Sequence, residues 1–319
     1  MRKYTSAIHL TALLVTLIVF HAPALAQEQK PVRMKPMGKE AFQVLTQFFQ
    51  YDRGIPLDAT IVQTVEDSTY IREKIVFTGV HDSRVPGYLA IPKTGSPPYP
   101  CVLLMLGGVA AGKAAWWERS VWMGEGPYSD GWITQGLLAA GYAVLALDAQ
   151  YYGERIMGND YRSLTGDILR RNWGSRGRET IVQSTVEYRR AIDYLTTRPE
   201  IDTTRIGATG YSLGGMMTFY LTAVEPRIKV AFPCITAQNI YDIPGIEVLA
   251  PWHYVRAVGD RPLLMLMSGN DPFYLVEDAQ RLFKLIKGST KDLQFYDVEG
   301  HHLPEEHIPV SIEWFKKYL

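Results

Sequence analysis

The sequence is poor in the residues that build disulfide frameworks and metal sites. Only two of its 319 residues are cysteine, Cys101 and Cys234, and each lies in an apolar run typical of a buried strand. Two cysteines and seven histidines, with no H-E-x-x-H spacing, do not provide a zinc site. We therefore predict no metal and no other cofactor, and we expect both cysteines to be buried thiols that act as small apolar side chains.

The sequence also lacks an excess of charge of either sign. It contains 33 basic and 33 acidic residues, so its formal net charge is +0. This balance gives no reason to expect a nucleic acid or an anionic membrane surface as a partner. No internal repeat or low-complexity tract interrupts the chain, which is long enough to bury a large core in one domain.

The first 26 residues have the organisation of a signal peptide. Arg2 and Lys3 are basic, residues 8–20 are mostly apolar, and Ala24-Leu25-Ala26 is a small-residue cleavage site. The apolar run is too short for a membrane-spanning helix, and no second run follows it. We predict a cleaved signal peptide over residues 1–26 and an exported protein, periplasmic or secreted, with no membrane attachment; a retained anchor is the alternative.

Apolar strands alternate with amphipathic helices from Cys101 onward, which favours a doubly wound, mostly parallel sheet. The predicted strands cover residues 101–106, 143–147, 205–209, 230–235, 262–267 and 293–298. The predicted helices cover residues 132–140, 179–197, 216–224, 276–286 and 308–318. Residues 70–78 and 85–91 alternate as an antiparallel hairpin does. Residues 39–51 have helical spacing, and this helix either packs on the main body or acts as a lid.

The stretch from Arg205 to Met216 joins a short apolar strand to an apolar helix. Between them, Gly210-Tyr211-Ser212-Leu213-Gly214 fits the G-x-S-x-G pattern. The outer glycines have no Cβ, so strand and helix approach closely and the serine is left at the carboxyl edge of the sheet. The helix N-terminus then offers N–H groups to a developing oxyanion. This context indicates that Ser212 is a nucleophile, and a Gly/Ser-rich turn is the alternative.

These residues resemble the α/β-hydrolase superfamily over nearly the whole mature chain. Residues 205–215 look like its nucleophile strand and turn. Residues 85–92, and residues 143–148 followed by Gly153-Glu154-Arg155, look like its dienelactone-hydrolase-like and acetyl-xylan-esterase-like branches. The resemblance implies a single α/β-hydrolase domain over residues 27–319, with an antiparallel leading hairpin and an N-terminal helical extension.

A nucleophilic serine requires a base and a carboxylate that orients the base. In this superfamily the acid follows the nucleophile in the chain and precedes the histidine. Asp271 directly follows the predicted strand 262–267, which places it at the same sheet edge as Ser212. We predict that Asp271 is the acid, with Asp242 and Asp297 as weaker alternatives. The alternative without a catalytic role is that Asp271 is only a turn residue before Pro272.

The predicted base lies in Gly300-His301-His302-Leu303-Pro304, after the last strand. His301 matches the superfamily's Gly-His-x-x-Pro pattern, so we choose it, with the adjacent His302 as the alternative. His253 and His307 do not follow a strand end, and we expect them to be structural.

Two backbone N–H groups are expected to form the oxyanion hole. One belongs to Leu213, directly after the nucleophile, and the other to the loop 106–113. The superfamily usually has His-Gly at the start of this loop, where this sequence has Leu106 in place of the histidine. That departure leaves Gly108 or Val109 as the second donor, and we choose Gly108.

The expected activity is hydrolysis of a small-molecule or carbohydrate ester through an acyl-enzyme. A serine peptidase of the prolyl-oligopeptidase-like branch, or a hydrolase fold used only for binding, are the alternatives. Several aromatic residues could form a rim that suits a sugar or an aryl acid, or they could pack the loops together: Trp116, Trp117, Trp122, Trp132, Tyr151, Tyr152 and Trp173. Four basic residues could contact an acidic substrate group, or be solvated or paired at the surface: Lys113, Arg119, Arg155 and Arg178.

Overall fold

A computed structural model describes residues 31–81, 83–105, 107–108, 111–117, 130–156, 174–236 and 244–319. The predicted signal peptide lies outside these residues, so its cleavage and the export of the protein remain predictions. The division of the chain into a signal peptide and one domain also remains a prediction. Within the described residues, no helix combines the length and the apolar character needed to cross a membrane.

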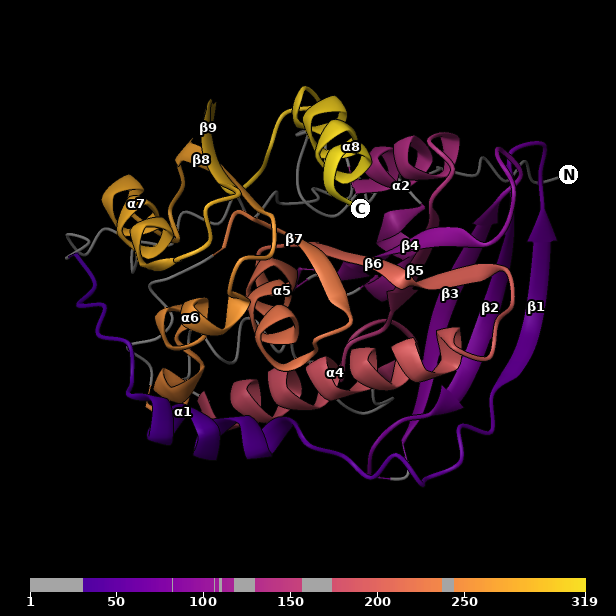
Figure 1. The fold of residues 1–319 in the computed structure, drawn as a ribbon, viewed down its shortest axis with the longest axis horizontal. Coiled ribbons are helices and arrows are strands. Elements are labelled where there is room, and N and C mark those ends of the chain that lie inside the picture. Colours follow the sequence, from indigo (N-terminus) through magenta and orange to yellow (C-terminus); the bar gives the residue numbers. More distant parts are fainter. Residues whose placement is uncertain are drawn as a thin grey trace, which may run out of the picture. The chain divides into compact units, whose positions relative to one another are not determined.

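The core of the fold is a sheet with the strand order β1-β2-β3-β5-β4-β6-β7-β8-β9 (Figure 1). β1, β2, β3 and β5 pair antiparallel, and all pairs from β5 to β9 are parallel. The predicted parallel sheet with antiparallel strands at its start is therefore confirmed. The strands are β1 (Thr60–Glu66), β2 (Tyr70–Thr78), β3 (Arg84–Pro92), β4 (Tyr99–Met105), β5 (Ala143–Leu147), β6 (Ile201–Tyr211), β7 (Ile228–Cys234), β8 (Leu263–Asn270) and β9 (Lys291–Glu299).

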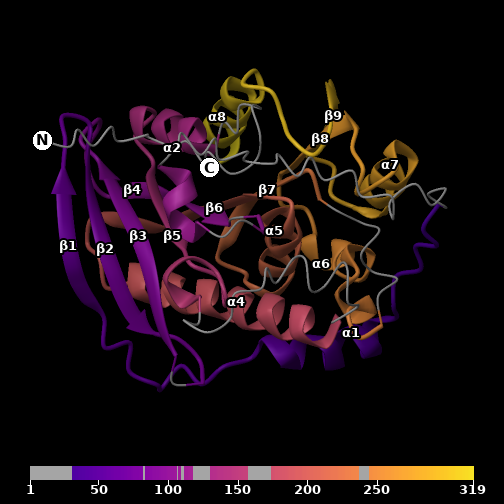
Figure 2. The ribbon, with the colours of Figure 1, turned by 180° about the vertical axis from the view of Figure 1, so that it is seen from behind.

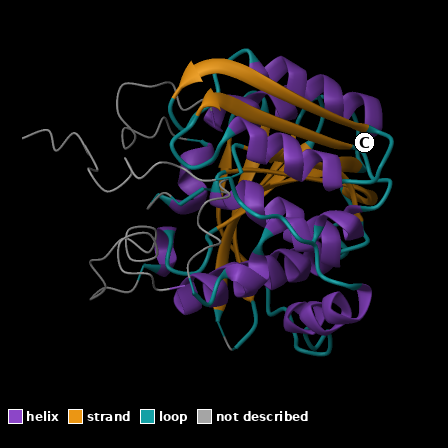
Figure 3. Cartoon of the chain, turned by 90° about the vertical axis from the view of Figure 1, so that its left-hand side faces the viewer, coloured by secondary structure: helices purple, strands orange, loops and turns teal. Residues whose placement is uncertain are grey.

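Helices cover both faces of this sheet, which forms a layer between them (Figure 3). α2 and α8 contact each other on one face, and α4 and α5 contact each other on the other face (Figure 1). The α-helices are α1 (Lys39–Thr46), α2 (Asp130–Ala139), α4 (Gly174–Leu195), α5 (Leu213–Val224), α6 (Val255–Val258), α7 (Val276–Leu285) and α8 (His307–Tyr318). The 3-10 helices are η1 (Gln47–Phe49), η2 (Gly112–Trp116), η4 (Gly153–Arg155), η6 (Glu247–Leu249) and η7 (Pro251–His253).

The central strands are continuous apolar runs because helices bury them on both faces. Every residue of β4 and β5 is buried. Cys101 on β4 and Cys234 on β7 are both buried and form no disulfide, because β6 lies between their strands. The prediction of two buried thiols is confirmed, and burial raises the pKa of Cys101.

β1 was not predicted from the sequence. All seven of its residues are exposed, so it lacks the buried-exposed alternation that marks a strand with one face in the core. It extends the expected hairpin to three antiparallel strands and forms the free edge of the sheet (Figure 2). β6 is also longer than predicted, because residues 202–204, which have the composition of a turn, continue the strand.

The N-terminal helix packs on the main body. Phe49 in η1 is fully buried and meets the Tyr254 ring edge-on, with 6.0 Å between the ring centres. Arg189 on α4 donates a hydrogen bond of 2.5 Å to the Phe49 carbonyl oxygen. These contacts favour the packing role, although Phe48 in the same segment is 67% exposed.

Candidate active site

Ser212 occupies a strained turn between β6 and α5. Its φ of 57° and ψ of −117° are rare for a residue with a side chain. The turn is tight, because a Cβ on Gly210 would lie 2.5 Å from the carbonyl oxygens of Gly214 and Met105. The backbone N–H of Ser212 donates to the Cys234 carbonyl oxygen at 3.1 Å, which ties the turn to β7. The local structure is therefore the one that G-x-S-x-G predicts.

The hydroxyl of Ser212 does not cap the helix that follows. Ser212 is the N-cap of α5 but makes no side-chain capping hydrogen bond. Leu213, the first residue of α5, has its N–H at the helix N-terminus, where backbone donors have no partner within the helix. This N–H and the helix dipole both favour negative charge beside Ser212.

The loop after β4 lies against the same turn. A Cβ on Gly107 would be 3.0 Å from the Tyr211 carbonyl oxygen and 3.4 Å from the Ser212 Cβ. Gly108 is half-buried and follows directly. Leu106 and Val109 lie outside the described residues, so the choice of Gly108 over Val109 as the second oxyanion donor remains a prediction.

Asp271 and His301 are brought together by adjacent parallel strands. Asp271 follows β8 and His301 follows β9, and the Asp271 Oδ2 lies 2.6 Å from the His301 Nδ1. The carboxylate is fully buried, and its Oδ1 accepts a hydrogen bond of 2.8 Å from the Phe273 N–H. Because Nδ1–H donates to the carboxylate, Nε2 of His301 is the nitrogen that can accept a proton.

The turn that carries Asp271 is held by a buried tyrosine. The Tyr274 hydroxyl accepts a hydrogen bond from the Ser268 N–H at 2.8 Å and donates to the Ser268 carbonyl oxygen at 3.1 Å. Burial, together with the nearby Asp271 charge, raises the pKa of Tyr274, so the hydroxyl stays protonated and keeps both bonds.

Among the described residues, the other acid and histidine candidates are not part of the contact between Asp271 and His301. Asp297 is exposed on β9, and Asp242 lies outside the described residues. The carboxylate contact of Asp271 is made by His301, whose neighbour His302 is half-buried. His253 accepts a hydrogen bond from the Met37 N–H at its Nδ1, at 3.2 Å. This contact fits the structural role expected of that residue.

His307 is expected to make the folded protein less stable as the pH falls from 6.5 to about 4. Burial, partly opposed by the Pro304 carbonyl and Glu306, lowers its pKa from 6.5 to about 4. The unfolded chain therefore takes up the proton first, so this stabilisation is present above pH 6.5 and is lost as the pH falls. Its size is about 3 kcal/mol at about 1.4 kcal/mol per pKa unit. Urea unfolding of the wild type and of His307→Gln across this range checks it, and equal pH slopes would contradict it.

A buried charge cluster adjoins the oxyanion loop, and sequence reasoning did not find it. Asp148, fully buried after β5, accepts hydrogen bonds from the Lys113 N–H and Nζ, both at 2.7 Å, and from the Glu154 N–H at 2.9 Å. Burial alone would raise the pKa of Glu154, but hydrogen bonds from Lys113 and Lys74 hold it below its ordinary value. The cluster therefore joins η2, β5 and η4.

Two glycines make room for the Asp148 carboxylate. Gly112 and Gly153 have φ values of 59° and 57°, and a Cβ on either would lie 2.2 Å from the Asp148 Oδ1. The sequence signal for this cluster is the Gly153-Glu154-Arg155 stretch that follows β5, which carries part of the family resemblance.

Three of the four basic residues considered for an acidic substrate are engaged within the protein. Lys113 contacts Asp148 and Glu154, and Arg155 forms an ion pair with Glu187 at 2.5 Å. Arg178 donates to a backbone carbonyl oxygen at 2.9 Å. Arg119 lies outside the described residues. Lys113 and Arg155 are therefore ion-paired within the protein and Arg178 is hydrogen-bonded to the backbone, which disfavours a contact with an acidic substrate group.

The described aromatic residues considered for a substrate rim pack against the core, and two of them are buried. Trp116 is fully buried, with its ring centre 5.6 Å from that of Tyr211, and Tyr152 is also buried. Trp117 meets the Tyr88 ring edge-on at 5.2 Å, and the Tyr151 ring lies 4.5 Å below the Arg176 guanidinium. Three of the candidates lie in segments whose side chains are not described: Trp122, Trp132 and Trp173.

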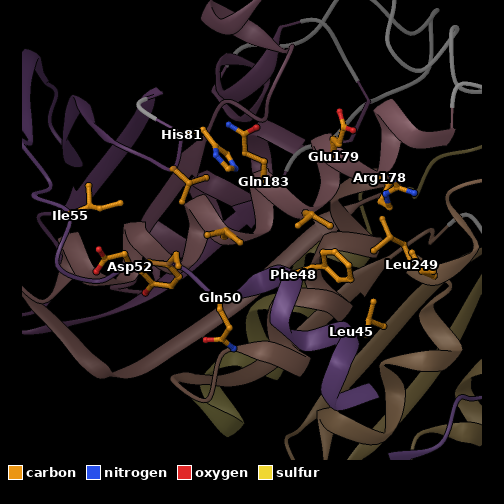
Figure 4. Close-up of a pocket in the computed structure, with 15 residues that line it drawn as sticks. Leu45, Phe48, Gln50, Asp52, Ile55, His81, Arg178, Glu179, Gln183 and Leu249 are labelled. Carbon is orange, nitrogen blue, oxygen red and sulfur yellow. The ribbon is translucent and has the colours of Figure 1, made fainter. Parts of the chain in front are cut away.

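A cavity of roughly 990 Å³ lies on the outer side of α4 (Figure 4). Its lining includes Phe48 from η1, His81 from the turn before β3, and Arg178 and Gln183 from α4. It contains none of the predicted triad residues, so it is separate from the candidate active site. In the described part of the chain, no group of three or more His, Cys, Asp or Glu side chains is placed to hold a metal ion.

Solved structures share this fold at low sequence identity. Acetyl xylan esterase 1 from Thermoanaerobacterium sp. JW/SL YS485 is similar with a TM-score of 0.65 and 17% identity, covering 90% of this chain and 95% of that chain. Acetyl xylan esterase from Paenibacillus sp. R4 gives a TM-score of 0.65 and 17% identity, covering 91% of this chain and 97% of that chain. These likenesses establish the α/β-hydrolase fold.

Sequence comparison gives the family. YtaP of Bacillus subtilis (strain 168) is 27% identical over 253 residues, covering 72% of this chain and 79% of that protein. Bis(hydroxyethyl) terephthalate hydrolase of Streptomyces coelicolor (strain ATCC BAA-471 / A3(2) / M145) is 27% identical over 203 residues, covering 60% of this chain and 59% of that protein. A model of the dienelactone hydrolase family matches residues 125–303, which is more than half of the chain. The chain therefore belongs to the dienelactone hydrolase family.

Proposed function

We propose that this protein is an exported serine esterase that cleaves carboxylic esters through an acyl-enzyme. The observation that carries the proposal is the 2.6 Å contact between the Asp271 Oδ2 and the His301 Nδ1. It lies at the sheet edge where Ser212 occupies its strained turn. A nucleophile, a base and an orienting acid at one edge are the groups that acyl transfer requires.

The first half of the reaction forms the acyl-enzyme. The Ser212 Oγ attacks the ester carbonyl carbon while the His301 Nε2 takes the hydroxyl proton. The carbonyl oxygen becomes an oxyanion that accepts hydrogen bonds from the N–H groups of Leu213 and Gly108. When the tetrahedral intermediate collapses, His301 gives its proton to the leaving alcohol, and Asp271 stabilises the imidazolium in between.

The second half releases the acid. Water enters where the alcohol has left, loses a proton to the His301 Nε2, and attacks the acyl carbon. The second tetrahedral intermediate uses the same oxyanion hole, and His301 returns the proton to the Ser212 Oγ. Every proton transfer of the two half-reactions therefore passes through the His301 Nε2.

Small-molecule or carbohydrate esters are the proposed substrates. Structural neighbours are described as acetyl xylan esterases, and a sequence relative as a bis(hydroxyethyl) terephthalate hydrolase. The acyl group of an acetylated xylan is small, whereas a terephthalate acyl group is a bulky aromatic acid. The two classes therefore call for acyl pockets of different size, which chromogenic esters distinguish.

The test uses the chain from Gln27 onward with p-nitrophenyl acetate, p-nitrophenyl butyrate and an aminoacyl p-nitroanilide. We expect ester hydrolysis, and a fluorophosphonate should label a single peptide that contains Ser212. An acetate rate far above the butyrate rate indicates a small acyl pocket. Folded protein that cleaves neither ester and takes no label would refute the esterase, and cleavage of only the anilide would favour a peptidase.

A further inference from the structure

His307, the first residue of α8, is buried and uses both of its ring nitrogens in hydrogen bonds. Its Nε2 lies 2.5 Å from the Tyr211 hydroxyl, and its Nδ1 lies 2.6 Å from the Pro304 carbonyl oxygen. The side chain is completely buried. A carbonyl oxygen can only accept, so Nδ1–H donates to Pro304 and Nε2 accepts the hydrogen of the Tyr211 hydroxyl. His307 is therefore one defined neutral tautomer with both nitrogens used.

The two ends of this contact belong to two segments of the proposed triad. Tyr211 directly precedes Ser212, and Pro304 closes the segment that carries His301. The near end of that segment is fixed by the Gly300 N–H, which donates to the Asn270 carbonyl oxygen at 2.7 Å. His307 fixes the far end with its Nδ1–H, and its backbone N–H adds a 3.1 Å hydrogen bond to the same Pro304 oxygen.

Tyr211 also touches the oxyanion loop. Its ring meets the His307 ring edge-on at 5.6 Å on one side and the buried Trp116 of η2 at 5.6 Å on another. The Tyr211 carbonyl oxygen lies 3.0 Å from the place where Gly107 would carry a Cβ. The nucleophile turn, the base segment and the loop after β4 therefore all meet at this one tyrosine.

We propose that Tyr211 and His307 are positioning residues that hold the His301 segment in register with Ser212. The proposal rests on the proposed function, because it assumes that Ser212 and His301 react with each other. Neither residue touches the substrate in this role. The hydrogen bond between the Tyr211 hydroxyl and the His307 Nε2 links the β6–α5 turn to His307. The Nδ1–H of His307 in turn holds Pro304, which lies in the same segment as His301. A base displaced by about 1 Å loses about 100-fold in rate.

The first arm of the test removes the contact from each side. Tyr211→Phe deletes only the hydroxyl, and His307→Asn keeps a donor near Pro304 while losing the acceptor for Tyr211. We expect each variant to lower kcat for p-nitrophenyl acetate by about 10- to 100-fold with KM within about twofold. If both act through one contact, the double variant should be no slower than the slower single variant.

Tyr220→Phe is the matched control. Tyr220 is another fully buried tyrosine, on α5, whose hydroxyl donates to the Leu249 carbonyl oxygen at 2.5 Å, away from the triad segments. It should lose stability but keep its kcat when all variants are assayed below their melting temperatures. The inference is overturned if Tyr211→Phe keeps wild-type kcat and fluorophosphonate labelling rate, or if the single effects multiply in the double variant. Activity that survives in Ser212→Ala would instead refute the proposed function.

Discussion

Replacing Ser212 by alanine is expected to lower kcat for ester hydrolysis by about 10⁴- to 10⁶-fold while KM changes little. The variant keeps the binding groups and the oxyanion donors but has no atom that can form the acyl-enzyme. Alanine adds no bulk to the turn, so the fold should be preserved. Initial rates with p-nitrophenyl acetate at saturating and subsaturating concentrations separate kcat from KM.

The same assay, applied to variants of the two adjacent histidines, shows which of them is the base. His301→Asn should cost nearly as much as Ser212→Ala, and the double variant should be no slower than either, because triad residues act as a unit. His302→Asn is the matched control, because Asp271 contacts His301 and not the next residue. A large loss in His302→Asn with little loss in His301→Asn would assign the base to the other histidine.

Replacing Asp148 by asparagine is expected to lower the free energy of unfolding by about 3–5 kcal/mol. Lys113 is 3% exposed and Asp148 is completely buried, so the variant leaves a buried ammonium with Glu154 as its partner in the cluster. The amide has only one acceptor oxygen, so its NH₂ would face at least one of the N–H groups that now donate to the carboxylate. Urea denaturation at pH 7 measures the change, which should appear in the midpoint and not in the slope.

Two further variants show whether the buried charge is responsible. Asp202→Asn removes one partner of the Asp202–Arg205 pair, whose arginine is 44% exposed, and should cost less than about 1 kcal/mol. Asp148→Asn combined with Lys113→Met should recover part of the loss, because both charges are then absent. If Asp148→Asn destabilises no more than Asp202→Asn, the cluster does not contribute to stability in this way.

Strand ends explain how much of the candidate site could be read from the sequence. Asp271 follows β8 and His301 follows β9, and these neighbouring parallel strands have their carboxyl ends at one edge of the sheet. Their contact therefore follows from the order of the elements along the chain. The turn at Ser212 could also be predicted, because the spacing of its glycines is a local property of the sequence.

The contacts that support the site could not be read in the same way. The ion pair between Lys113 and Asp148 joins η2 to the end of β5, and no local pattern indicates which basic residue meets which acid. The bond between Tyr211 and His307 spans two layers of the fold, and His307 carries no strand-end signal. Periodicity predicts which face of an element is buried, but it does not predict which polar atoms meet there.

The burial of α5 has a consequence for inactivation by heat. The residues of α5 from Leu213 to Thr222 are all buried, and the helix packs against β6, β7, α4 and α6. We expect the amide hydrogens of this helix to exchange only through the largest openings of the molecule. The turn that carries Ser212 should therefore not melt before α5 does, so heating should not release the nucleophile separately from the core of the fold.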